Sequence, residues 1–213
     1  MEKESIKEII TIIIAAIVLA LAVSFPNSTI LLTTSIFFIV IIAVNVVVKK
    51  IIAYSLEANV TIKFWSWYQY GWRKDSHFKS PVPMFWLPVV LSFITRGFFY
   101  WLSILEFDIT PRTERVSKKH GLYRFSEITD WHTASIACFG ISANLILAIL
   151  GYIFASFYPS LELFARLNIY YAFWSIIPLS SMDGNKILFG SKLLWFIFAV
   201  ITTLALVWSL IIV

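Results

Sequence analysis

The chain has 213 residues, of which 60% are hydrophobic and only 14% are charged, and its mean hydropathy is +0.84. Soluble domains carry about 25% charged residues, so this composition excludes an ordinary soluble domain and predicts an integral membrane protein. The formal net charge of +5 does not by itself indicate nucleic-acid binding, because lysine and arginine gather in the cytoplasmic loops of membrane proteins.

Five apolar segments approach or exceed the length of about 20 residues that crosses a bilayer. In chain order they are residues 9–25, 30–48, 135–157, 167–179 with its flanks, and 193–213. The first follows a mixed-charge start without a small-residue cleavage site, so we expect a retained helix rather than a signal peptide. The prediction is an all-α integral membrane protein with about five transmembrane helices, in which residues 1–213 form a single polytopic domain.

Two basic loops, residues 49–80 and 107–130, flank a further apolar segment at residues 81–106. If this segment crosses the membrane, the two loops lie on opposite faces. If it enters and returns, turning near Arg96 and Gly97, then 15 of the 17 lysines and arginines lie on one face. The positive-inside rule favours this re-entrant hairpin, which other protein must cover. We therefore expect a cytoplasmic N-terminus, cytoplasmic basic loops and an external C-terminus.

Residues 58–68 follow the second apolar segment directly and alternate apolar with polar side chains. Val60, Ile62 and Phe64 are the apolar set. A period of two is typical of a half-buried strand, so we expect a short interfacial strand here. An ordinary interfacial segment is the alternative, because the tryptophans and tyrosines that follow suit the headgroup region.

The stretch "WSIIPLSSMDGNKILFG", residues 174–190, interrupts the apolar pattern. Pro178 cannot donate to a helical ladder and Gly184 adopts backbone shapes that other residues avoid, so we expect the helix to loosen between them. Asp183 is then an acidic residue at membrane depth. Such residues are costly and mark functional sites by default, although an aspartate at an interfacial helix end is the competing interpretation.

The spacing of Pro178, Asp183 and Gly184 resembles the third core segment of the site-2 proteases, which are intramembrane zinc metallopeptidases. In that family the aspartate is a zinc ligand, and Ser175 stands here where the family has asparagine. The resemblance implies a site-2-protease-like core over residues 39–192. Residues 1–38 would form peripheral helices, and residues 193–213 would form a C-terminal helix.

Two further positions carry the resemblance. Gly140 and Asn144 resemble the family's preceding core helix, with Ile141 in place of its usual proline. The family's first motif, HExxH, puts two zinc-binding histidines on one helix face and a glutamate that activates water between them. The chain contains no HExxH motif.

Aligning Ala53 with the alanine that follows the family's first motif places Asn45 and Lys49 at the histidine positions and Val46 at the glutamate. The resemblance therefore implies the family's architecture without its catalytic centre and without a cofactor. Asn45, Lys49 and Asp183 become former metal-site positions. We predict an ion pair between Lys49 and Asp183, with a hydrogen bond added by Asn45. The alternative is that Lys49 extends to the interface.

A relocated metal site is the alternative for cofactor binding. The loop that leads into residues 135–157 contains His120, Glu127, Asp130 and His132. Their spacing matches no established zinc pattern, and acidic residues suit the start of the following helix. In this alternative His132 and Asp183 would be the zinc ligands.

The favoured function is a pseudoprotease, a non-catalytic protein that binds or regulates another membrane protein segment. The predicted strand, with Val60, Ile62 and Phe64, would offer an edge for strand addition. One alternative is a divergent active intramembrane zinc metallopeptidase. Another is a small transporter or channel subunit, because broken helices with buried charge also line transport sites. The expected partners are membrane lipid and another transmembrane protein or peptide segment, with no nucleic acid.

Overall fold

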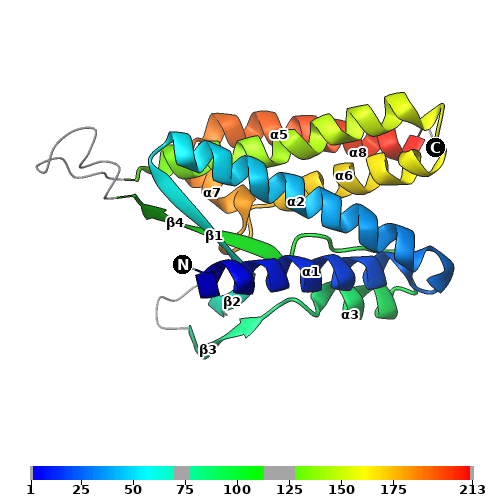
Figure 1. The fold of residues 1–213 in the computed structure, drawn as a ribbon, viewed down its shortest axis with the longest axis horizontal. Coiled ribbons are helices and arrows are strands. Elements are labelled where there is room, and N and C mark those ends of the chain that lie inside the picture. Colours follow the sequence, from blue (N-terminus) through cyan, green and yellow to red (C-terminus); the bar gives the residue numbers. More distant parts are fainter. Residues whose placement is uncertain (1, 70–76, 113–127, 212–213) are drawn as a thin grey trace, which may run out of the picture.

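The computed structural model describes residues 2–69, 77–112 and 128–211 (Figure 1). Its longer helices are α1 (Glu2–Ser24), α2 (Leu31–Ser55), α5 (Asp130–Ala155), α6 (Ser160–Ile176) and α8 (Lys192–Ile211). Its shorter helical elements are the 3-10 turn η1 (Ser28–Ile30), α3 (Leu87–Ile94) and α7 (Asp183–Gly190). Its strands are β1 (Ala58–Phe64), β2 (Ser66–Gln69), β3 (His77–Pro83) and β4 (Leu105–Pro111).

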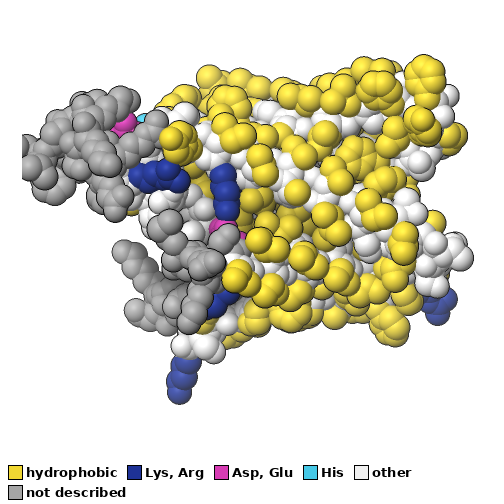
Figure 2. All heavy atoms as spheres, viewed as in Figure 1, with side chains coloured by type: hydrophobic (Ala, Val, Ile, Leu, Met, Phe, Trp, Pro, Cys, Tyr) yellow, Lys and Arg dark blue, Asp and Glu magenta, His cyan; other side chains and the backbone are white. Residues whose placement is uncertain are grey.

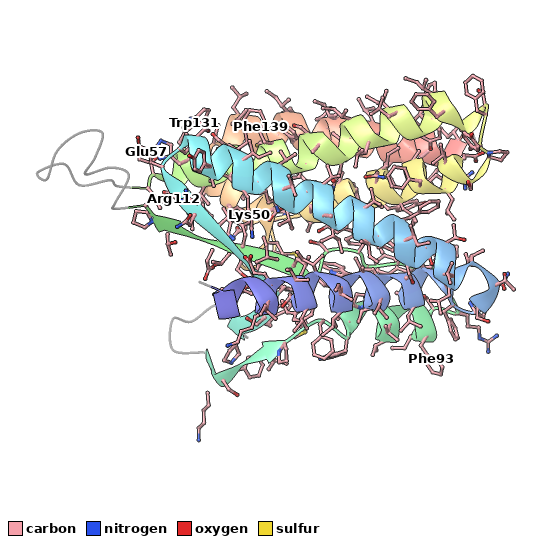
Figure 3. The ribbon with its side chains drawn as sticks, in the orientation of Figure 1. Lys50, Glu57, Phe93, Arg112, Trp131 and Phe139 are labelled. Atoms are coloured by element: carbon pink, nitrogen blue, oxygen red, sulfur yellow. The ribbon has the colours of Figure 1, made fainter. Side chains whose placement is uncertain are left out.

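The protein is a mostly helical integral membrane protein. Four helices of the described part are long and apolar enough to cross a membrane, and they belong to α1, α2, α5 and α8. Hydrophobic side chains cover the flank of the bundle, whereas the basic side chains gather mainly at the end that holds the N-terminus (Figure 2). On α5, Trp131 and Phe139 point away from the bundle, with 53% and 50% of their surface exposed (Figure 3).

The fifth predicted span corresponds to α6, which is shorter than the others. It has 17 residues and ends at Ile176, two residues before Pro178. A helix of this length is about 26 Å long, slightly less than the hydrocarbon core of a typical bilayer. Helix α6 packs against both α5 and α8. The two termini lie at opposite ends of the bundle (Figure 1).

The apolar segment at residues 81–106 does not form one long helix. It leaves β3, forms the short helix α3 against α1, reverses, and returns in extended form to β4 (Figure 1). The chain reverses at Arg96 and Gly97, where the sequence predicts a turn. Both residues have a positive φ, at 53° and 80°. A β-carbon on Gly97 would also overlap the carbonyl of Phe25, so glycine suits this position for two reasons.

The predicted interfacial strand is present as β1, which pairs antiparallel with β4 from Ala58 opposite Pro111 to Phe64 opposite Leu105. A second pair joins β2 and β3. Neither β3 nor β4 was predicted, although residues 105–110 alternate apolar and polar side chains as β1 does. The alternation in β4 crosses the boundary between the apolar segment at residues 81–106 and the basic loop at residues 107–130, so neither segment contained the whole pattern. Strand β1 packs against α1 and α2, and the β1–β4 sheet lies between α1 and the end of the bundle that contains α7 (Figure 1).

Candidate functional site

The segment around Pro178 loosens as predicted and delivers Asp183 to the start of α7. Helix α6 ends at Ile176, whose carbonyl accepts a hydrogen bond from Trp195 Nε1 at 3.0 Å. The following turn includes Ser180 with a positive φ of 49°. Asp183 then occupies the first turn of α7, where the helix dipole favours a negative charge.

Gly184 allows α7 to approach the end of α6 closely. A β-carbon at this position would overlap the backbone carbonyl groups of Ile176 and Ile177. The Asp-Gly pair therefore has two separate roles in the structure. The aspartate carries a buried charge. The glycine has no side chain, so α7 can pack closely enough against the end of α6 to place this charge beside the bundle.

Lys49 and Asp183 form the ion pair that the sequence predicts. Lys49 Nζ lies 2.5 Å from Asp183 Oδ2, and each side chain is only 6% exposed. The neighbouring Lys50, with its side chain 42% exposed, pairs with Glu8 instead. Lys49 therefore does not extend to the interface, and its charge is neutralised inside the protein by a residue 134 positions away.

The absence of a side chain at Gly140 makes room for Lys49. A β-carbon there would lie 2.6 Å from Lys49 Cε and 3.1 Å from Asn45 Nδ2. The predicted hydrogen bond from Asn45 to Asp183 is wrong, because the Asn45 amide nitrogen has no hydrogen-bond partner among the described residues. Asn45 Nδ2, Asp183 Oδ1 and both amide atoms of Asn144 are buried without a hydrogen-bond partner among the described residues.

A second lysine, Lys186, joins the site one turn after Asp183. Its Nζ donates a hydrogen bond to the carbonyl of Phe107 in β4 and lies 3.8 Å from the centroid of the Phe107 ring. Lys49 Nζ lies 4.8 Å from the centroid of the same ring. Two ammonium groups thus lie near one buried aromatic ring, which attracts each of them. The two positive charges repel each other, and the charge of Lys49 lowers the pKa of Lys186. From the sequence, Lys186 is only one of the 15 basic residues expected on one face of the membrane.

Glu106 and Ser181 complete this cluster. The Ser181 hydroxyl donates to Glu106 Oε2. Burial raises the pKa of the Glu106 carboxyl, although the Ser181 hydrogen bond and the Lys186 charge oppose this shift. Burial lowers the pKa of Lys186 to about 8, against the opposing influence of Asp183. The cluster therefore combines two lysines with two carboxylates, which balance formally in charge.

Lys186 predicts a pH dependence of stability. Its pKa falls from 10.5 to about 8 on folding, so between these values the unfolded chain binds a proton that the folded protein has released. The contribution of Lys186 to stability is therefore least favourable below pH 8 and increases up to pH 10.5. We expect the melting temperature of the wild type to rise, relative to Lys186→Met, as the pH increases across this window. A constant difference between the two proteins would contradict the buried position of Lys186.

His132, the alternative zinc ligand, serves a structural role at the start of α5. Its backbone N–H and its Nδ1 form a reciprocal capping box with Thr129, at 3.4 Å for each contact. Asp183 pairs with Lys49 instead. His120 and Glu127 lie outside the described residues. Within residues 2–69, 77–112 and 128–211, no group of three histidine, cysteine or acidic side chains is arranged to hold a metal ion.

The backbone of β1 has two different edges. The carbonyl of Glu57 and the N–H of Trp65 both form hydrogen bonds on the side of β4. Because the direction alternates along a strand, the main-chain N–H and carbonyl groups of the odd-numbered residues between them also point toward β4. The main-chain groups of Val60, Ile62 and Phe64 therefore face the outer edge. At that edge, the N–H of Ile62 donates to Glu8 Oε1 at 2.7 Å.

Comparison with known proteins assigns no family to the chain. No family model matches it, and neither a curated protein nor a solved structure shows significant similarity to it.

Proposed function

We propose that this protein is a non-catalytic membrane protein with a site-2-protease-like core that binds an extended segment of another membrane protein. The observation that carries the proposal is the buried ion pair between Lys49 and Asp183. An ammonium group at 2.5 Å from the aspartate repels a divalent cation from the position where the resemblance implies a metal. Val46 at the glutamate position also offers no group to activate water.

The arrangement of the elements supports the resemblance. In α2, Asn45 and Lys49 are one turn apart, and the helix leads directly into β1. In α5, Gly140 lies against both of these side chains. In α7, Asp183 lies beside Lys49, as expected if the three segments retain the family's core packing. Fold likeness alone does not establish an activity, so the proposal depends on the chemistry of the former metal site.

The position of the basic side chains supports a proposal for the orientation in the membrane. We infer that this end, which holds the N-terminus, is cytoplasmic. The segment containing α3 would then enter from the cytoplasmic side and return to it. Its packing against α1 supports this inference, because a re-entrant backbone needs protein cover.

The outer edge of β1 is the proposed binding site. An extended segment adds to such an edge through main-chain hydrogen bonds, while alternate side chains provide selectivity. Val60 and Ile62 are buried and Phe64 is half-buried on the same face, so the strand is held firmly by the protein beneath it. Binding of this kind requires no metal and no nucleophile.

A fluorescent ten-residue peptide of alternating valine and threonine tests the function with purified protein in detergent. We expect saturable binding, measured by fluorescence anisotropy, and an intact peptide by mass spectrometry after prolonged incubation. The matched control peptide carries N-methyl groups on the amides of one edge, which prevents strand addition. Equal binding of both peptides, or cleavage of the first, would contradict the proposal.

A further inference from the structure

Glu8 in α1 connects three elements through one carboxylate. Its Oε1 accepts the N–H of Ile62 in β1 at 2.7 Å. Its Oε2 lies 2.5 Å from Nζ of Lys50 near the end of α2, the residue labelled in Figure 3. The Glu8 side chain is only 13% exposed, so α1 itself brings a fixed acceptor to the outer edge of β1.

The Glu8 carboxylate occupies the position that a carbonyl oxygen of an added strand would take. The outward N–H groups of an edge strand are unpaired, and an added strand bonds them with its carbonyl oxygens. Ile62 is central among the residues whose main-chain groups face this edge. When an incoming segment reaches this edge, the central donor, the Ile62 N–H, is therefore already hydrogen-bonded to Glu8.

Lys50 holds the carboxylate in place. A hydrogen bond to an ionised acceptor is stronger than one between neutral groups, which makes the contact with Ile62 effective as a block. The Lys50 side chain is 42% exposed, so water reaches this ion pair and its contribution is modest. The contact is thus strong enough to occupy the edge and weak enough to be displaced.

We propose that Glu8 is an intrachain latch that closes the outer edge of β1 until an extended segment displaces it. This inference rests on the proposed binding function of that edge. The displacing segment supplies a carbonyl oxygen to the Ile62 N–H, and the Glu8 carboxylate stays paired with Lys50 or moves into water. No covalent change is involved, and the first turns of α1 move away from β1 as binding proceeds.

Hydrogen exchange at the Ile62 amide measures the latch directly. We expect exchange in Glu8→Ala to be about tenfold faster than in the wild type, which corresponds to the loss of one hydrogen bond to a charged group. Glu8→Gln keeps an acceptor but loses the charge, so its exchange rate should be intermediate. The amides of Thr61 and Lys63 face β4 and should not change.

Peptide affinity provides the second arm of the experiment. The alternating valine–threonine peptide should bind Glu8→Ala about tenfold more tightly than the wild type, because the variant no longer has to release the Ile62 N–H. Lys7→Ala removes an exposed charge from the adjacent position of α1 and is the matched control. Its exchange rate and its affinity should equal those of the wild type.

The outcomes separate the two proposals. Unchanged exchange at Ile62 in Glu8→Ala would overturn the latch. Faster exchange with equal peptide affinity in Glu8→Ala and the wild type would also overturn it, because the contact would then not restrict binding. Faster exchange with no peptide binding to either protein would overturn the binding function itself, and the latch with it.

Discussion

Asp183→Ala is expected to lower the free energy of unfolding by about 3–5 kcal/mol, because it leaves the buried Lys49 ammonium without its counter-ion. The loss should appear as a lower melting temperature and a lower yield of folded protein in detergent. The matched control is Asp108→Ala, which breaks the Lys63–Asp108 pair, whose side chains are 52% and 51% exposed. An exposed pair contributes about 0–1 kcal/mol, so this control should change stability little.

The double variant Lys49→Met with Asp183→Leu shows whether the two residues stabilise the protein as an ion pair or contribute to stability independently. Removing both charges together leaves no uncompensated ion, and apolar side chains of similar size can restore or improve stability. We expect the double variant to recover most of the melting temperature that Asp183→Ala loses. If the melting temperature of the double variant is as low as that of Asp183→Ala, the two residues do not act as a pair.

Gly184→Ala is expected to destabilise the protein by about 1–3 kcal/mol, the usual range for overpacking. The added β-carbon overlaps the backbone carbonyl groups of Ile176 and Ile177, which cannot move without shifting the end of α6. Alanine would otherwise favour a helix over glycine by about 1 kcal/mol, so the expected sign opposes helix propensity. Thermal unfolding of the purified variant measures the effect.

Gly140→Ala is the comparison for this variant. Its β-carbon meets the flexible end of the Lys49 side chain at 2.6 Å, rather than backbone. A lysine side chain can adjust, so we expect a smaller loss of stability than in Gly184→Ala. The reverse order would mean that the close approach of α7 to α6 is less restrictive than the structure indicates.

The sequence predicts the parts of this fold that depend on local pattern. Apolar length predicts the long helices, the alternation around Ile62 predicts β1, and Gly97 predicts the reversal between α3 and β4. The contact between Lys49 and Asp183 was predicted from a resemblance that aligns segments far apart in the chain. The relationship to the site-2 proteases itself stays a prediction.

The rest of the site depends on tertiary contacts that no local pattern carries. From the sequence, Lys186 is expected at the surface, because no neighbouring residue indicates that its side chain will contact the carbonyl of Phe107. Glu106 and Ser181 meet only because the end of the β1–β4 sheet packs near α7. The contact of Glu8 with the edge of β1 likewise requires α1 to lie beside a strand residue that is 54 positions further along the chain.

Metal analysis of the protein, purified without chelators and without a histidine tag, tests the central claim most directly. Because Asp183 binds the Lys49 ammonium, we predict far less than one zinc ion per chain by mass spectrometry, with no change in Asp183→Ala or in His132→Ala. One zinc ion per chain that is lost in either variant would contradict the account, and would indicate a metallopeptidase with an unfamiliar set of ligands.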